Sequence, residues 1–438
     1  MKQKLNSDRI QYIFQNMDDA VCMTRMTGEI FFANPSAEKL FGIELREEVK
    51  IWEAIPYVEG NDELIQLFID GVMEKKKSIR SLVDYVNNEG KVYHLHVSLT
   101  CDGGEQGGFL IVISDLTNLQ KVQSAFARYT SPEIADYVLS DPEGEKQGGQ
   151  ERDVSILMSD LRGFTAMSAQ LSSNELIIVL NHYFKHMSAV IRRFRGTVIE
   201  FLGDGIFVVF GAPGDLPDHT EAAVACAVEM QNEMAEVNRW NRENGYPMLE
   251  MGIGINTGKA VVGNIGSEDK MKYGCMGETV NLAGRTESLT VGGEVLITEN
   301  TRSRITGRIM INGERKMKLK GVGREISVYD VAGIGDSHVL KETEKEIRWN
   351  DITPAKELLF YMLRGKTVET ADHTGRLTRI SEDEKYGILA AEDTPEALTN
   401  LMLRIEGHDI YAKVLQEEDS GCRLRFTSRD VSIISLIG

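Results

Sequence analysis

The sequence lacks paired cysteine motifs and long apolar runs. Its five cysteines stand singly in 438 residues, at Cys22, Cys101, Cys226, Cys275 and Cys422. Without Cys-x-x-Cys pairs, the sequence predicts neither a disulfide framework nor a zinc knuckle, and we expect reduced thiols. Its apolar stretches end well before the roughly 20 residues of a membrane span, and residues 1–6 precede no signal-peptide core. We therefore expect a cytoplasmic protein with no membrane partner.

Positive charge is also scarce. The chain has 49 Lys and Arg against 67 Asp and Glu, a net charge of −18 and a pI near 5.0. Such a surface repels nucleic acid and anionic lipid, so we expect no nucleic-acid partner and an output that is a small molecule. The 42% hydrophobic content indicates ordinary folded cores, and the length predicts about three domains.

Two short acidic motifs stand out against this background. Asp160 follows the mostly apolar, strand-like residues 154–158, and Asp204 lies in a Gly-Asp-Gly turn between strand-like residues 197–201 and 206–210. Taken singly, each is better explained as a helix cap or an ordinary turn. Together, at adjacent strand ends, they could bridge a metal pair, because Mg²⁺ commonly takes one or two carboxylates plus substrate phosphates. The pair predicts a two-metal phosphoryl-transfer site.

A third motif strengthens that interpretation. Asn281 and Arg285 lie four residues apart, which puts them on one face of an expected helix, and Arg offers a fixed fork of donors to phosphate oxygens. The order Asp, Gly-Asp-Gly, Asn-x-x-x-Arg resembles the class III nucleotidyl cyclase catalytic domain, here over residues 151–333. Residues 251–258 and 318–323 fit the same resemblance.

The resemblance implies an enzyme that converts a nucleoside triphosphate into its 3′,5′-cyclic monophosphate and pyrophosphate. It makes Asp160, Leu161 and Asp204 the ligands of two Mg²⁺ or Mn²⁺ ions about 4 Å apart, one activating the ribose 3′ oxygen and one holding the triphosphate. These family members share their sites between two antiparallel catalytic domains. Since this chain carries every part, we expect a homodimer with two equivalent sites and an inactive monomer.

The opposite subunit would supply the remaining groups. By resemblance, Asn281 orients the ribose, Arg285 neutralises charge at the α-phosphorus in the transition state, and Lys320 holds the departing phosphates. Lys318 is the rival for that last role.

The resemblance also locates the residues that read the base, at Glu200 and Gly274. Guanylate cyclases have Glu at the first position, where a carboxylate accepts from guanine N1–H and N2–H, whereas adenylate cyclases usually have Lys. Glu200 therefore favours GTP, because facing it with adenine N1 would leave buried acceptors unpaired at a cost of about 1 to 3 kcal/mol. Vertebrate guanylate cyclases commonly have Cys at the second position, but here Cys275 comes one residue later, and no donor to guanine O6 is identified. An adenylate cyclase with Glu200 turned away, and a catalytically silent nucleotide-binding scaffold, are the alternatives.

Residues 1–118 resemble a PAS sensor domain. The order of helix, strand, Asn-Pro turn, short helices and strands fits, and an Asp-x-Thr at residues 115–117 is typical of the tie to the exit helix. No cysteine lies in a flavin-photoreceptor context. His94 and His96 share a strand face and could bind haem or metal, but such a pair is more often satisfied or solvent-facing. The ligand or signal of the domain is not assigned.

Residues 119–150 form the expected helical signalling linker. Leu119, Val122, Phe126 and Tyr129 follow the a/d spacing of a short coiled coil. Ser131 and Pro132 predict an N-cap and first position of a second helix, and residues 141–150 read as a flexible joint.

A charged linker is expected at residues 334–354, followed by a small β-barrel at residues 355–438. This region distantly resembles a PilZ-like domain, but its arginines, Arg376 and Arg379, have two residues between them instead of three. A structural or partner-binding barrel is therefore the better interpretation. The predicted fold class is α+β and multidomain, with a PAS sensor, a ferredoxin-like α/β sandwich and a C-terminal barrel. A capping box at Ser172 and Glu175 should start a long helix of the sandwich.

Overall fold

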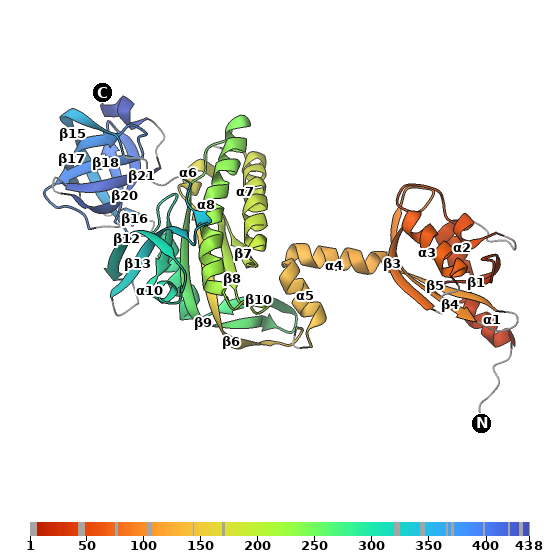
Figure 1. The fold of residues 1–438 in the computed structure, drawn as a ribbon. Coiled ribbons are helices and arrows are strands. Elements are labelled where there is room, and N and C mark those ends of the chain that lie inside the picture. Colours follow the sequence, from red (N-terminus) through yellow and green to blue (C-terminus); the bar gives the residue numbers. More distant parts are fainter. Residues whose placement is uncertain are drawn as a thin grey trace. The chain divides into compact units, whose positions relative to one another are not determined.

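The computed structural model describes residues 7–42, 49–74, 78–102, 107–142, 144–168, 171–318, 325–341, 347–364, 367–368, 372–396, 399–418, 421–428 and 432–437. It divides into two compact units, Met1–Tyr129 and Thr130–Gly438. The second unit holds both a large mixed sheet and the C-terminal barrel (Figure 1). The α+β, multidomain fold class is confirmed.

The first unit is a five-stranded antiparallel sheet with short helices packed on one face (Figure 1). Its elements are α1 (Ser7–Gln15), β1 (Ala20–Arg25), β2 (Ile30–Ala33), α2 (Pro35–Phe41), η1 (Ile51–Ala54), α3 (Asp62–Met73), β3 (Ser78–Val86), β4 (Val92–Asp102) and β5 (Gly108–Asp115). The strand order is β2-β1-β5-β4-β3. Leu95, Val97 and Leu99 alternate into the core, as expected for a half-buried strand.

The predicted tie between this sheet and its exit helix is confirmed. The Thr117 N–H donates to the Asp115 carboxylate (2.9 Å), and Thr117 Oγ1 accepts from the His94 N–H (3.0 Å). The His94 carbonyl also accepts from the Leu116 N–H at 2.8 Å. The start of α4 (Thr117–Tyr129) is therefore fixed to the end of β5 and to the neighbouring strand β4.

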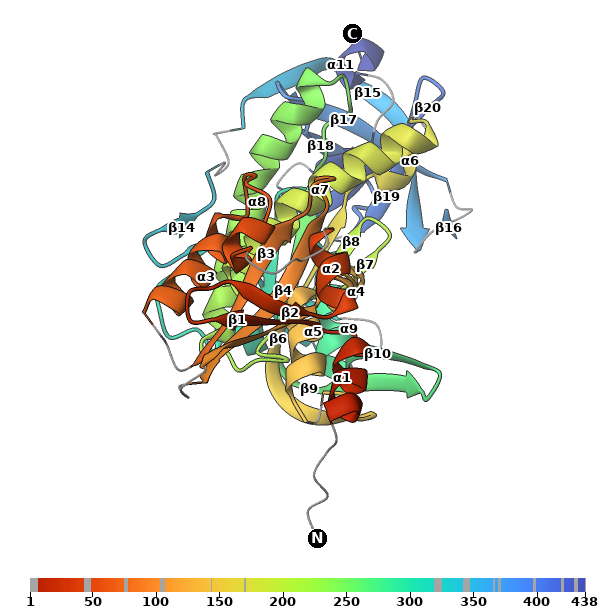
Figure 2. The same ribbon diagram turned by 90° about the vertical axis from the view of Figure 1, so that its right-hand side faces the viewer.

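Two linker helices follow the sequence prediction. In α4, Leu119, Val122 and Tyr129 are exposed, so the coiled-coil pairing stays a prediction. In α5 (Pro132–Ser140), the Ser131 hydroxyl caps the Ile134 N–H at 3.3 Å, which confirms the N-cap. Helix α5 packs on β6, β9 and β10 of the second unit (Figure 2).

The second unit is built on a nine-stranded sheet. Its strands are β6 (Gly148–Leu161), β7 (Thr197–Leu202), β8 (Gly205–Phe210), β9 (Met251–Ser267), β10 (Lys270–Met276), β11 (Val295–Thr298), β12 (Ile309–Lys318), β13 (Glu325–Ile334) and β14 (His338–Val339). The main order is β12-β13-β11-β9-β6-β8-β7, with β10 paired to β9 and β14 to β13. Only β9 and β11 pair in parallel within the described strands.

Helices cover both faces of this sheet. They are α6 (Phe164–Ser168), α7 (Ser173–Arg193), α8 (His219–Glu243), α9 (Glu278–Ser288) and α10 (Glu299–Arg302). Leu157 and Val208 face α7 and α8, whereas their strand neighbours Ile156 and Val209 face α5 and α9. Alternation along buried strands thus builds the predicted α/β sandwich. The capping box of Ser172 and Glu175 is also present.

The last residues of the segment expected to be a flexible joint, residues 141–150, form a strand instead. Strand β6 already begins at Gly148, and Gly149 pairs with Gly263 of β9. A Cβ on Gly263 would lie 2.6 Å from the Gly149 Cα, so the glycines allow two backbones to approach closely. Sequence reasoning took these glycines for flexibility, but they serve strand pairing.

The C-terminal region is a closed six-stranded barrel with one short added strand. It consists of β15 (Trp349–Arg364), β16 (Thr367–Val368), β17 (His373–Ser381), β18 (Tyr386–Ala391), β19 (Asn400–Ile405), β20 (His408–Glu418), β21 (Gly421–Ser428) and α11 (Ile433–Ile437). Pairing of β15 with both β17 and β19 closes the ring, which removes free edges. The expected C-terminal barrel is confirmed, and β15 starts within the segment expected to be a linker.

Candidate active site

Asp160 and Asp204 lie at neighbouring strand ends. Asp160 is the penultimate residue of β6, and Asp204 occupies the turn between β7 and β8, whose Gly203 has a φ of 69°. Strands β6 and β8 are paired through Ser159 and Ile206, and the Leu161 N–H donates to Asp204 Oδ2 at 3.2 Å. The predicted hairpin is present, and it brings the two carboxyl groups together.

The environment of these carboxyl groups favours a bound cation. Burial, and then the nearby charge of Asp160, raise the pKa of Asp204 to about 6. Two carboxylates that repel each other in a partly buried place are relieved by a divalent ion with oxygen preference. Among the described residues, no group of three or more His, Cys, Asp or Glu side chains forms a metal cluster. Oxygen donors of this kind, two carboxylates and the Leu161 backbone carbonyl, are ligands that Mg²⁺ or Mn²⁺ accepts together with phosphate oxygens.

Arg162 connects this strand end to α9. Its guanidinium forms an ion pair with Glu287 and lies 3.5 Å from Asp160 Oδ2, with about 16% of its side chain exposed. Burial lowers the pKa of Arg162, and Asp160 and Asp204 oppose that shift. The backbone N–H of Arg162 also donates to the backbone carbonyl of Glu250 at 2.7 Å. Arg162 therefore fixes the loop that follows the first carboxylate.

Asn281 and Arg285 lie on α9, as the sequence predicts. Neither side chain makes a hydrogen bond or ion pair with any residue that the structure describes, and the Asn281 side chain is exposed. The helix itself is held tightly, because a Cβ on Gly254 of β9 would lie 2.5 Å from the Glu287 Cα. The start of α9 is fixed by Thr279, whose hydroxyl donates to the Lys259 carbonyl at 2.6 Å. A rigid helix thus presents two unengaged polar groups.

Glu200 has a partner that the sequence interpretation missed. It forms an ion pair with Lys272 of β10, and both side chains are about half exposed. Tyr273 and Cys275 are buried, so the opposite face of β10 carries Lys272 and Gly274. Gly274 therefore shares the face of β10 that approaches Glu200, and Cys275 points into the core.

Two lysines of the sequence interpretation have no described side chain. Lys320 lies outside the described residues, and the side chain of Lys318, at the end of β12, is also outside them. Their roles stay predictions.

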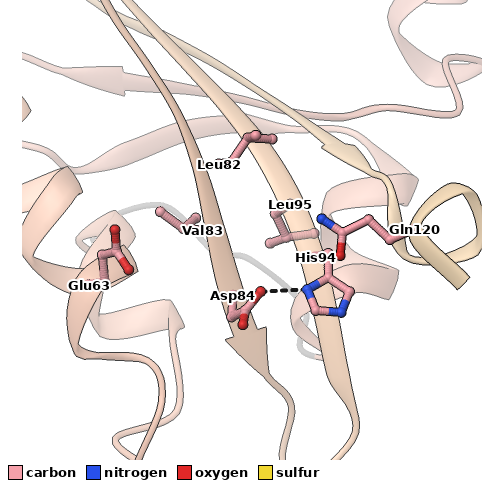
Figure 3. Close-up of a pocket in the computed structure, with 7 residues that line it drawn as sticks. All are labelled: Glu63, Leu82, Val83, Asp84, His94, Leu95 and Gln120. Atoms are coloured by element: carbon pink, nitrogen blue, oxygen red, sulfur yellow. Dashed lines mark hydrogen bonds and ion pairs between the residues drawn. The ribbon is translucent and has the colours of Figure 1, made fainter. Parts of the chain in front are cut away.

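The first unit has a polar recess of about 180 Å³ on its sheet, close to the start of α4 (Figure 3). His94 Nδ1 lies 2.6 Å from Asp84 Oδ1, with Gln120 of α4 beside them. Asp84 thus gives the His94 ring a hydrogen-bond partner, as expected. The backbone N–H of the same His94 donates to Thr117. A shift of His94 in this recess would therefore directly affect the N-terminal end of α4.

Sequence reasoning missed Lys272, Arg162 and Glu287 as parts of the site. A signal existed for Lys272, because it lies two residues before Gly274 on a strand and must share its face. Arg162 and Glu287 are 125 residues apart, and only the tertiary fold brings them together.

Comparisons with known proteins agree with this geometry. Residues 147–340 match the family model described as adenylate and guanylate cyclase catalytic domain, and residues 8–73 match a PAS domain model. The chain is 29% identical over 211 residues to adenylate cyclase 1 of Rhizobium meliloti (strain 1021), covering 48% of this chain and 32% of that protein. It is 31% identical over 188 residues to an uncharacterized protein of Mycobacterium tuberculosis, covering 42% and 31%. The chain thus spans about a third of these curated relatives.

Solved structures of both kinds of cyclase are similar to the catalytic region. The guanylyl cyclase Cya2 is 48% identical, with 44% of this chain and 100% of that chain covered and a TM-score of 0.43. The adenylyl cyclase CyaB from P. aeruginosa is 33% identical, with 44% and 98% covered and a TM-score of 0.41.

Proposed function

The chain belongs to the adenylate and guanylate cyclase family through residues 147–340, with a PAS domain at residues 8–73, and on this premise we propose that it converts GTP into 3′,5′-cyclic GMP and pyrophosphate. Cyclisation joins the ribose 3′ oxygen to the α-phosphorus and expels pyrophosphate. The site must therefore manage negative charge at the attacking, central and leaving groups. The observation that carries the proposal is the adjacency of Asp160 and Asp204 at paired strand ends.

The carboxylates of Asp160 and Asp204, with the Leu161 backbone oxygen, would hold two Mg²⁺ or Mn²⁺ ions. The bound divalent ions would activate the ribose 3′ oxygen and neutralise the negative charge of the triphosphate. Arg162 supports these ligands, since its guanidinium contacts Asp160 and is held in turn by Glu287. The ligand loop is thus preorganised before substrate arrives.

The polar groups on α9, together with Lys320, would act on the nucleotide of a second copy. Arg285 would neutralise charge on the α-phosphorus, Asn281 would orient the ribose, and Lys320 would hold the leaving phosphates. The Asn281 and Arg285 side chains have no hydrogen-bond or ion-pair partner among the described residues, which supports this role, because a side chain reserved for substrate needs no internal partner. Two antiparallel copies would form two equivalent sites.

Guanine specificity rests on Glu200. A carboxylate accepts from N1–H and N2–H together, and the ion pair with Lys272 would hold the Glu200 carboxylate in place beside the base. Gly274 leaves space beside guanine O6 and supplies no acceptor for an adenine amino group. Lys272 is a donor on the same face of the base site and suits guanine O6.

Adenylate cyclase is the second candidate, and the same Lys272 favours it. If its ammonium turns to adenine N1 while Glu200 stays on the solvent side, the site would accept ATP. Adenylate cyclase 1 of Rhizobium meliloti carries that activity in its name.

Product analysis separates the candidates. Purified full chain is incubated with Mn²⁺ and either GTP or ATP, and each cyclic product is quantified, with Asp204→Asn as the inactive control. We expect cyclic GMP to form about tenfold faster than cyclic AMP, because an unpaired buried acceptor costs about 1 to 3 kcal/mol and about 1.4 kcal/mol corresponds to a factor of ten. Predominant cyclic AMP supports the second candidate, and the absence of both products identifies a silent scaffold.

A further inference from the structure

Two basic side chains of the barrel are buried against the catalytic domain. Lys413 of β20 and Arg425 of β21 are paired in register, and each is only 3% exposed. Charged residues are rarely buried this far without partners. Both find their partners outside the barrel, in the cyclase part of the same compact unit.

Lys413 binds the end of α9. Its ammonium donates to the carbonyls of Ser288 (3.1 Å) and Thr290 (3.3 Å). Ser288 is the last residue of α9, where carbonyl groups have no partner within the helix, and a cation is favourable at this end of the helix dipole. Arg285 lies three residues earlier, within one turn of the bound carbonyl.

Arg425 binds the loop beside the metal ligands. Its guanidinium donates to both Glu250 oxygens, at 2.9 and 3.1 Å, and lies 4.9 Å above the Tyr386 ring. The backbone carbonyl of Glu250 accepts from the backbone N–H of Arg162. The guanidinium of Arg162 in turn contacts both Asp160 and Glu287. The barrel therefore contacts α9 directly through Lys413 and is linked to Asp160 through Glu250 and Arg162.

We propose that the C-terminal barrel holds α9 and the Asp160 loop in the arrangement that catalysis requires, with Lys413 and Arg425 as positioning residues. This inference rests on the proposed function, because it assigns α9 to the transition state. Loosening α9 would misplace Arg285 where charge develops, which lowers kcat more than it changes KM.

The test compares Lys413→Met and Lys413→Arg in the full chain. Lys356→Met is the matched control, since Lys356 pairs with Glu406 inside the barrel at 2.7 Å. We measure kcat and KM with the preferred triphosphate, and hydrogen exchange of the peptide spanning residues 278–290. We expect Lys413→Met to lower kcat about tenfold or more, with KM changed less than about twofold and faster exchange in α9. Lys413→Arg should recover most of kcat, and the control should match the wild type.

Unchanged or raised kcat in Lys413→Met would overturn the inference. Should that variant not fold, Glu250→Gln tests the second contact of the barrel, because its amide oxygen still accepts from Arg425 while the charge is lost. Unchanged kcat in Glu250→Gln would then overturn the inference. If the wild type makes no cyclic product, the proposed function fails, and the exchange of α9 still decides whether the barrel holds the helix.

Discussion

Arg162 and Glu287 form an ion pair that joins the strand end carrying Asp160 to the helix carrying Arg285. If Asp160 and Arg285 of one chain serve different sites of a dimer, this pair links the two sites within a single protomer. The pair should also make α9 and the loop after Asp160 respond together to changes elsewhere in the chain.

Glu287→Gln should lower both stability and turnover. It leaves the Arg162 guanidinium poorly compensated, with both side chains about 15% exposed, and breaking such pairs costs up to about 3 to 5 kcal/mol when fully buried. Thermal unfolding and initial rates measure the effect. Glu236→Gln is the control, because its pair with Arg239 is exposed and should contribute almost nothing. Equal behaviour of both variants would contradict this role.

A charge reversal at Glu200, the residue proposed to read the base, should change substrate preference. Glu200→Lys removes the acceptor for guanine N1–H and should lower kcat/KM for GTP by about tenfold or more. The double variant Glu200→Lys with Lys272→Glu keeps an ion pair between the two strands while reversing its direction. Competition between GTP and ATP measures the ratio. If the double variant regains the GTP preference of the wild type, the pair is structural and does not read the base.

Metal-free protein should show a pH-dependent contribution from Asp204. Its pKa is raised to about 6 in the folded chain, above the usual value of 3.8, so the folded state binds more protons between these values. Stability from this group is therefore present at low pH and is lost as the pH rises through 6. In EDTA, Asp204→Asn should raise the melting temperature relative to wild type at pH 7 but much less at pH 4.5. Asp336→Asn, whose carboxylate is 89% exposed, is the control.

Regulation through the PAS domain predicts a specific weak point. Thr117→Val keeps the shape of the residue but removes the hydroxyl that accepts from the His94 N–H. Turnover should change in the same direction as on removal of residues 1–118, because both loosen α4 from the sheet. Thr100→Val, at an exposed position of β4, is the control. Unchanged turnover and dimerisation in both the truncated chain and Thr117→Val would refute the coupling.

The sequence predicted the elements that depend on local pattern. The hairpin around Asp204, the helix carrying Asn281 and Arg285, and the caps at Ser131 and Ser172 follow from turn and capping chemistry. The sequence could not predict the contacts of Arg162 and Lys413, because their partners lie about 125 residues away. These contacts depend on how the sheet and the barrel pack.

Glycines were the other source of error. Those after residue 147 look like a flexible joint, yet Gly149 lies against Gly263 in a paired strand. The sequence alone does not show whether such glycines make a flexible joint or allow two strands to approach closely, because that depends on the partner strand.

The central claim, that each site combines carboxylates of one protomer with Arg285 of its twin, is tested by subunit complementation. Asp204→Asn and Arg285→Ala, each nearly inactive alone, are co-expressed with different tags, and the heterodimer is isolated by both. One of its two sites then has intact carboxylates and an intact arginine, so we predict about half of wild-type cyclic nucleotide production. A heterodimer as inactive as its parents would contradict the account.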